Sequence, residues 1–126
     1  MGAKELRIVD ERQAQSRLKK LKRQPLYLIL EDVYDTYNIG GLFRLADALA
    51  VEKVYLCGQM EIPPNSRIQK ASIGTYKVVP WEYKKSAREA IRELKKNKVE
   101  VIAVEQDKRY VAYTEAKYSF PLALIV

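Results

Sequence analysis

Histidine is missing from this chain, and cysteine occurs once, as Cys57. Without histidine the chain has no imidazole general base, no Ser-His-Asp triad and no His-containing zinc site. A single cysteine also excludes an intramolecular disulfide and a cysteine-based zinc cluster. Any catalysis must therefore depend on other side chains, and we expect no metal site.

Long apolar runs are missing as well. No run approaches the ~20 residues of a membrane span, and four charged residues within the first ten do not resemble a signal peptide. Leu6 stands where a myristoylation signal needs Ser or Thr. We therefore expect a cytoplasmic protein with no membrane partner. Its 126 residues, 48% of them hydrophobic, suffice for one domain with one core.

The net charge of +7 is concentrated in two segments. Residues 1–25 contain eight basic and three acidic residues, and residues 84–98 contain seven and two. A localised positive charge favours a polyanionic partner. We interpret residues 84–98 as a solvated outer helix face, because Glu89 and Glu93 are spread among the cations. In the first segment, an RNA-binding arm and a merely solvated basic helix stay open as alternatives; the candidate contacts are Arg17, Lys19, Lys20, Lys22 and Arg23.

Apolar patterns of strand type and helix type alternate along the chain. Asn38 is a suitable N-cap for the first of the helices. Strands that alternate with helices predict an α/β fold, an open parallel sheet with helices on both faces. Residues 1–25 would then be a basic N-terminal segment, and residues 26–126 would be the α/β domain. The expected strands are 26–30, 53–57, 76–79, 99–104 and 121–126, and the expected helices are 40–50, 66–71 and 83–97.

The stretch from Glu31 to Arg44 joins the first strand to its helix and contains two adjacent glycines. These glycines do not form the G-x-G-x-x-G pattern of dinucleotide sites. Arg44 emerges from a strip of small residues that another backbone, a ribose or a phosphate could approach closely. Two interpretations stay open at this point. Asn38 and Arg44 hold a ligand, or Asn38 caps the helix and Arg44 pairs with Asp47 on a solvated face.

The sequence from Leu30 to Gly58 resembles the first signature of the SpoU (TrmH-like) family of the SPOUT RNA ribose 2'-O-methyltransferases. That signature has a strand, an acidic residue, an Asn-x-Gly step and an Arg on the following helix. The segment 70–81 is similar to the Ser-x-Gly segment of the family, with Ser72 and Gly74 in place. Residues 103–107 look like the loop after its fourth strand, and residues 120–126 like the strand before its second signature. The residues that match the first signature are Glu31, Asn38, Gly40 and Arg44.

This resemblance implies a SPOUT α/β-knot fold, a homodimer, and methyl transfer from S-adenosylmethionine to a ribose 2'-hydroxyl of structured RNA, either tRNA or rRNA. It implies catalytic roles for Arg44 and Asn38. Because the pKa of a guanidinium exceeds ~12, we expect Arg44 to position the hydroxyl and the adjacent phosphate rather than to remove a proton. The implied RNA contacts are Arg44, Lys70 and Ser72, and the implied cofactor contacts are Val104, Glu105, Gln106 and Val126.

The family's Gly-Asn-Glu loop would begin just after Val126, and its third signature does not occur in this sequence. We therefore expect a SpoU-type domain whose C-terminal knot segment is missing from the chain. The chain alone would bind S-adenosylmethionine weakly or not at all. The alternative is a non-catalytic RNA-binding module that keeps the basic surface and has no cofactor pocket.

Overall fold

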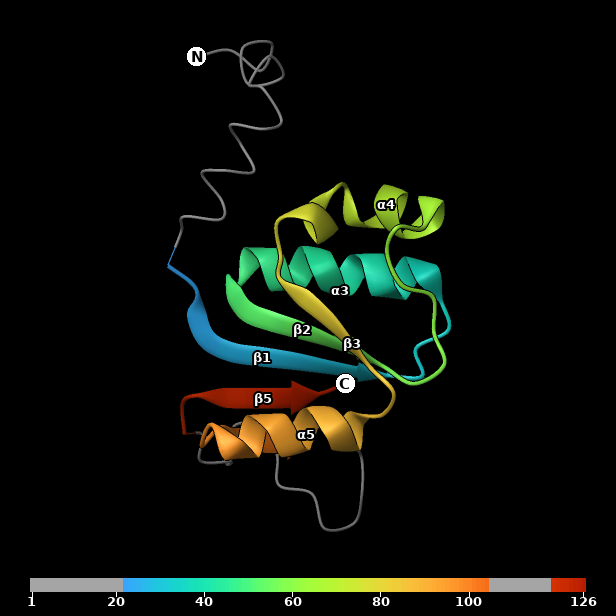
Figure 1. The fold of residues 1–126 in the computed structure, drawn as a ribbon. Coiled ribbons are helices and arrows are strands. Elements are labelled where there is room, and N and C mark those ends of the chain that lie inside the picture. The colour runs from blue at the N-terminus through green and yellow to red at the C-terminus, as the bar shows by residue number, and fades with distance from the viewer. Residues whose placement is uncertain (1–21, 105–118) are drawn as a thin grey trace, which may run out of the picture.

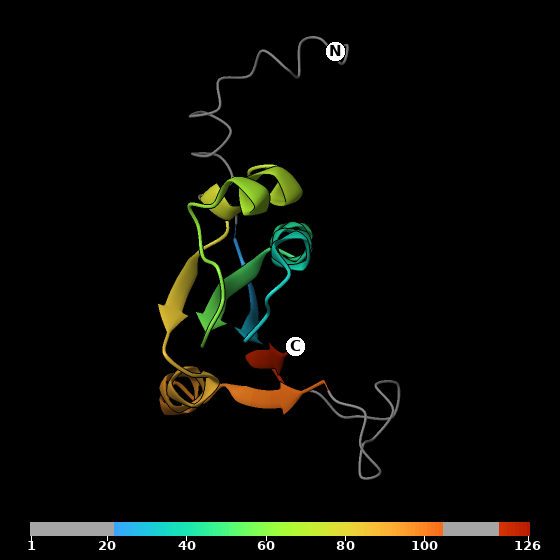
Figure 2. The same cartoon turned by 90° about the vertical axis from the view of Figure 1, so that its right-hand side faces the viewer.

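The structure of this protein is a computed structural model that describes residues 22–104 and 119–126. These residues form a parallel five-stranded sheet of order β3-β2-β1-β5-β4. The helices α3 and α4 lie on one face of the sheet, and α5 lies on the other (Figures 1 and 2). The expected open α/β sheet with helices on both faces is therefore confirmed. Its elements are β1 (Gln24–Glu31), α3 (Thr36–Ala48), β2 (Val51–Cys57), α4 (Ser66–Ser72), the 3-10 turn η1 (Thr75–Lys77), β3 (Trp81–Lys84), α5 (Ala87–Lys96), β4 (Glu100–Ala103) and β5 (Leu122–Ile125).

Alternate residues of the central strands face two separate cores. Leu28 and Leu30 of β1 pack with α3 and α4, whereas Ile29 between them packs with α5. Val54 of β2 likewise packs with α3, and Cys57 packs with α5. Because both faces are covered, these strands are continuous apolar runs without a polar side. Within the described part of the chain, no helix has the length and apolar character that a membrane crossing requires.

The start of α3 differs from the expectation. The helix begins at Thr36, and Asp35 caps it by accepting a hydrogen bond from the Tyr37 N–H at 2.8 Å. Asn38, which was expected to be the cap, is the third residue of the helix. The expectation was wrong because a carboxylate caps as well as an amide, and Asp35 comes earlier in the chain.

The expected strand at residues 76–79 was also wrong. Gly74 has a positive φ of 77°, and the Thr75 hydroxyl donates to the Ser72 carbonyl at 2.8 Å, which produces the tight turn η1. Val78 and Val79 are buried below this turn without belonging to a strand. Their apolar character serves the core, and the strand itself starts after Pro80.

A close approach of α3 and α4 fixes the helical layer on its face of the sheet. A Cβ added to Gly40 would lie 2.8 Å from backbone atoms of Ala71 and Ser72, closer than real Cβ contacts occur. Of the groups that could approach the small-residue strip, another backbone, a ribose or a phosphate, the structure shows the backbone of α4 in contact at Gly40. Gly41 has no atom within 4 Å of an added Cβ, so this glycine leaves open space at the surface.

We predict that Gly40→Ala destabilises the protein by about 1–3 kcal/mol, because the methyl group has to push two helix backbones apart. Gly41→Ala is the matched control, since it adds the same methyl to the same helix without a clash. That control should stabilise the protein by up to ~1 kcal/mol through the better helix propensity of Ala. Urea unfolding of both variants measures the difference, and equal effects would contradict the close contact.

Cys57 provides a second test of the packing. The residue is fully buried, and burial, followed by the nearby charge of Glu31, raises the pKa of its thiol to about 12. The thiolate is the reactive species. We therefore predict that Ellman's reagent labels native protein at pH 8 only as fast as the protein unfolds. Denatured protein should react at once with one thiol per chain, and equally fast labelling of native protein would contradict the burial of Cys57.

Candidate functional site

The parallel strands all end at one edge of the sheet, which is where ligands bind in open α/β folds. Two loops at this edge are locked together. Asp32 has a positive φ of 53°, its N–H donates to the Cys57 carbonyl at 3.0 Å, and its carboxylate accepts from the Gln59 N–H at 2.8 Å. Gly58, with φ of 78°, leaves room for that carboxylate. The loop between β1 and α3 therefore has a defined path toward the first turn of the helix.

Glu31, the acidic residue of the signature, ties β1 to α5. Its carboxylate accepts a hydrogen bond from the Ala87 N–H at 2.6 Å, and the Ser86 hydroxyl accepts from Glu89 N–H at 3.4 Å. A carboxylate at a helix N-terminus satisfies a free backbone donor and is favoured by the helix dipole. Glu31 thus positions the start of α5 at the same edge of the sheet.

Asn38 is exposed, and its side chain makes no hydrogen bond to the residues that the structure describes. Because Asp35 already caps α3, the amide of Asn38 has no capping task. Asparagine is an unfavourable residue inside a helix. Among the described residues, Asn38 therefore has no evident task in the fold, and its amide donor and acceptor are exposed.

Arg44 is exposed, and the alternative in which it pairs with Asp47 is not observed. Both residues belong to the described part of the chain, and no ion pair within 4 Å joins them. At 3.6 residues per turn, Arg44 lies about 40° around the helix from Gly40 and Asn38 about 160°. Since Gly40 faces α4, Arg44 points to the α4 side of the exposed surface and Asn38 to the opposite side.

A hollow of about 300 Å³ lies between the first turn of α3 and α4. The Tyr37 ring beside it is 72% exposed, and Arg67 and Lys70 form no ion pair with any described residue. An exposed ring next to two unpaired cations can stack a nucleobase and hold its phosphate. Lys70 was expected at an RNA surface from the sequence, whereas Tyr37 and Arg67 were not. The available signal was the position of Tyr37 next to Asn38, and the spacing of three residues between Arg67 and Lys70 on one helix. The hollow is lined by Thr36, Tyr37, Arg67, Lys70 and Ala71.

Ser72, the other expected RNA contact on α4, is fully buried. Its hydroxyl donates to the Gln69 carbonyl at 3.2 Å, and its backbone faces Gly40. RNA cannot reach this side chain while the helices are packed. Ser72 is therefore part of the buried contact between α3 and α4, and the assignment of its side chain to the RNA surface was wrong.

The basic N-terminal segment is only partly described. Arg17, Lys19 and Lys20 lie outside the described residues, and Lys22 is exposed. The Arg23 guanidinium donates to the Val51 carbonyl at 3.2 Å and to the Val78 carbonyl at 2.6 Å. These carbonyls lie at the beginning of β2 and before β3, on the edge opposite the strand ends. Arg23 therefore has a structural contact that the sequence did not indicate.

The expected cofactor residues lie at the carboxyl ends of β4 and β5. The Val104 N–H donates to the Ile125 carbonyl and the Val126 N–H donates to the Ile29 carbonyl, both at 3.0 Å, so these two valines are close together. Their side chains are 62% and 44% exposed and form an apolar surface at the ligand edge. Glu105 and Gln106 lie outside the described residues.

The chain is similar in sequence to curated RNA methyltransferases. The chain is 28% identical over 109 residues to the 23S rRNA (guanosine-2'-O-)-methyltransferase RlmB of Ralstonia nicotianae, which covers 86% of this chain and 43% of the relative. It is 30% identical over 88 residues to the RlmB of Neisseria meningitidis, covering 70% and 35%. The chain therefore spans less than half the length of these relatives.

Solved structures agree with this result. A TrmH/SpoU tRNA modifying enzyme of A. aeolicus superimposes with a TM-score of 0.76 at 23% identity, covering 91% of this chain and 59% of that one. An AdoMet-bound rRNA methyltransferase of Sinorhizobium meliloti gives 0.73 at 25% identity, covering 86% and 42%. The model of the SpoU rRNA Methylase family matches residues 25–126. The first signature, the sheet order and the extent of this match together show that the chain belongs to the SpoU family of RNA methylases.

Proposed function

We propose that the full-length protein transfers a methyl group from S-adenosylmethionine to a ribose 2'-hydroxyl of a structured RNA, tRNA or rRNA. The observation that carries this proposal is the state of the two signature side chains on α3. Asn38 and Arg44 are both exposed, and neither is engaged by a described residue. A fold-stabilising role would require partners, so ligand binding explains their presence better. The similarity to an rRNA methyltransferase and to a tRNA modifying enzyme supports the substrate class.

The proposed task of Arg44 is geometric. When bound, S-adenosylmethionine would supply an electrophilic methyl group for a new bond to the ribose oxygen, with the methyl–sulfur bond broken, S-adenosylhomocysteine as the leaving group and the hydroxyl proton released to water. A guanidinium keeps its proton at every ordinary pH and cannot act as the base. Its planar fork can instead donate to the phosphate and to the ribose oxygen at the same time, which fixes the direction of attack. The Asn38 amide can accept from the hydroxyl or donate to a neighbouring oxygen.

The cofactor would lie at the carboxyl ends of β4 and β5. Val104 and Val126 offer an apolar wall there, as described above. Contacts by Glu105 and Gln106 are part of the same proposal, because the loop that contains them follows β4 directly. Asn38 points away from α4, so its amide and this wall are available to the same ligand edge.

RNA would approach the exposed side of α3 and α4. Tyr37 would stack a base next to the methylated nucleotide, while Arg67, Lys70 and Arg44 would contact phosphates. Contacts from the N-terminal cations Arg17, Lys19, Lys20, Lys22 and Arg23 are proposed as well. For Arg23 the proposal is limited, because two backbone carbonyls already occupy part of its guanidinium.

We also propose that the full-length protein is a homodimer in the cytoplasm, where its RNA substrate would be found. Leu45 and Leu49 are one turn apart on the exposed surface of α3, and both are more than two fifths exposed. Two large apolar side chains next to each other on a helix surface favour burial against another protein. A second copy would cover them and bring the exposed surfaces of two α3 helices together.

Arg44→Lys in the full-length protein separates geometry from charge, because lysine keeps the charge and loses the planar fork. We expect single-turnover methyl transfer at saturating RNA and cofactor to fall by ~10²-fold or more, with little change in RNA affinity. Asp47→Asn is the control for the ion-pair alternative and should transfer methyl at the wild-type rate. Equal rates of methyl transfer for wild type and Arg44→Lys would contradict the proposed positioning role of Arg44. RNA binding without transfer by the wild type would favour the non-catalytic module.

Tyr37→Ala should weaken RNA binding by ~1–3 kcal/mol if the ring stacks on a base. Tyr37→Phe keeps the ring and should bind RNA as the wild type does. Tyr34→Ala is a matched control, because Tyr34 is 70% exposed, close in sequence, and does not line the hollow. Fluorescence anisotropy with a labelled single-stranded RNA measures all three. A loss with Tyr34→Ala equal to that with Tyr37→Ala would argue against a specific stacking position.

A further inference from the structure

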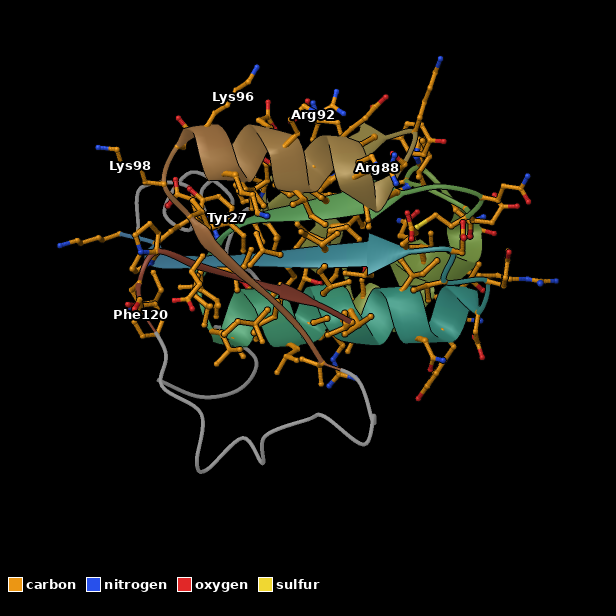
Figure 3. All side chains as sticks on the ribbon, turned by 90° about the horizontal axis from the view of Figure 1, so that it is seen from below. Tyr27, Arg88, Arg92, Lys96, Lys98 and Phe120 are labelled. Atoms are coloured by element: carbon orange, nitrogen blue, oxygen red, sulfur yellow. The ribbon has the colours of Figure 1, made fainter. Side chains whose placement is uncertain are left out.

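The outer side of α5 is a surface of unneutralised positive charge on the face of the sheet opposite α3 and α4. Figure 3 shows Arg88, Arg92 and Lys96 spaced along this helix, with Lys98 just beyond its end. All the cations of this surface are exposed, and none forms an ion pair within 4 Å with another described residue. We call it the α5 surface, and it consists of Lys85, Arg88, Arg92, Lys95, Lys96 and Lys98.

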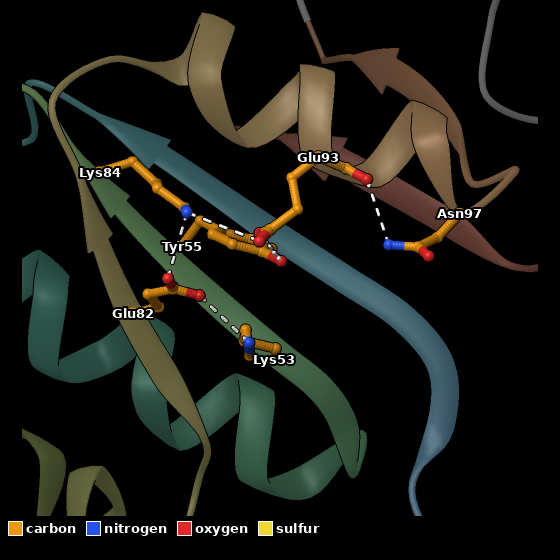
Figure 4. Close-up of polar contacts among 6 residues, drawn as sticks. All are labelled: Lys53, Tyr55, Glu82, Lys84, Glu93 and Asn97. Atoms are coloured by element: carbon orange, nitrogen blue, oxygen red, sulfur yellow. Dashed lines mark hydrogen bonds and ion pairs between the residues drawn. The ribbon is translucent and has the colours of Figure 1, made fainter.

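One of the two acidic side chains of α5 is directed away from this surface. Glu93 accepts a hydrogen bond from the Tyr55 hydroxyl at 2.8 Å and pairs with Lys84 at 3.6 Å, beneath the helix (Figure 4). Burial and the bond to Glu93 raise the pKa of Tyr55, so its hydroxyl keeps the proton that it donates. Lys84 is also paired with Glu82 at 3.1 Å. Of the acidic residues on α5, only Glu89 is left exposed.

Helix electrostatics explain only part of the α5 surface. Lys95 and Lys96 belong to the last turn, where the helix dipole favours cations. Arg88 is the second residue of α5, close to the positive end of the dipole, where a cation is unfavourable. Arg92 lies in the middle, where the dipole gives it no benefit. The fold therefore gives no reason for the two arginines.

Position connects this surface to the ligand edge. Arg88 follows Ala87, whose N–H is bound by Glu31 at the carboxyl end of β1. The same strand leads to α3, which carries Asn38 and Arg44. The residues 88, 92 and 96 then extend from that edge over about 12 Å of helix axis, at 1.5 Å per residue. An RNA strand that leaves the ligand edge could therefore continue along α5.

We propose that the α5 surface binds the phosphate backbone of RNA, as a contact separate from the α3 and α4 face; this rests on the proposed function, which supplies RNA as the partner. The exposed residues of α5 are all charged, and its apolar residues are directed to the sheet. A membrane-binding helix would need exposed apolar side chains beside its cations, and α5 has none. Regularly spaced arginines without apolar neighbours suit phosphates, which guanidinium groups bind with two parallel hydrogen bonds.

The test is the salt dependence of RNA binding by the chain with Arg88, Arg92 and Lys96 all replaced by Gln. Each lost phosphate contact reduces the slope of log K against log salt by about 0.7–0.9, so three lost contacts should reduce it by roughly two. The matched control is the triple variant Arg88→Lys, Arg92→Lys and Lys96→Arg, which keeps the charge and should keep the slope. Anisotropy of a labelled RNA hairpin measures both, and an unchanged slope in the Gln variant would overturn the proposal.

Arg88→Glu adds a readout that a structural role would not give. A carboxylate at this position is favoured by the helix dipole, so the melting temperature should stay the same or rise while RNA affinity falls. A lower melting temperature with unchanged RNA affinity would overturn the proposal and make Arg88 structural. Equally tight binding of poly-glutamate or phosphatidylserine vesicles, with the same loss in the Gln variant, would overturn the assignment to RNA.

Methyl transfer at saturating RNA separates this inference from the proposed function. If the Gln variant has a reduced salt slope but the wild-type protein transfers no methyl group, the α5 contact is supported and the proposed enzymatic activity is contradicted. If the slope is unchanged in the Gln variant and the wild-type protein does transfer methyl groups, the α5 contact is contradicted and the proposed enzymatic activity is supported.

Discussion

The contact between α3 and α4 at Gly40 determines what the surface of this protein can present. With any larger residue at position 40, the backbones of Ala71 and Ser72 could not lie against α3. This approach buries Ser72, and it brings the cations of α4 next to the exposed Tyr37 ring at the first turn of α3. The hollow between the helices, and the side of α3 to which Arg44 points, both follow from it. A glycine in a helix interior lowers stability by roughly 1 kcal/mol relative to Ala, and the close packing of two helices offsets that loss.

The other face of the sheet is organised by buried and half-buried polar contacts. Glu31 fixes the start of α5 through the Ala87 N–H, and Glu93 fixes its middle through Tyr55. Glu93 lies on the inner side of α5, and Glu31 of β1 lies at the N-terminal end of that helix. The exposed residues of α5 are therefore cations and Glu89. Inward-facing carboxylates thus have two consequences: they hold α5 on the sheet, and they leave its exposed arginines without partners.

The sequence predicted the architecture well, because continuous apolar strands such as residues 26–30 and the amphipathic pattern of α5 follow directly from burial on both faces. It predicted local boundaries less well where a competing residue decided the outcome. Asp35 replaced Asn38 as the cap, and Gly74 with Thr75 formed a turn where Val78 and Val79 suggested a strand. The candidate site was likewise predicted in part. Asn38 and Arg44 are exposed as expected, whereas the burial of Ser72 and the carbonyl contacts of Arg23 depend on residues distant in sequence.

The expectations for Asn38 and Ser72 were wrong in opposite directions: Asn38 was given a structural role that it does not have, and Ser72 was given a binding role although it is buried. Ser72 was assigned to RNA, but it is buried where α4 packs against Gly40, and its hydroxyl is bonded to the Gln69 carbonyl. Asn38 was given a structural task as a cap, and Asp35 performs that task instead. Asn38 does not cap α3, and Arg44 does not pair with Asp47. Among the described residues, neither signature side chain therefore has a contact that would stabilise the fold. Both side chains are exposed on α3, and the ligand binding that we propose would account for their presence there.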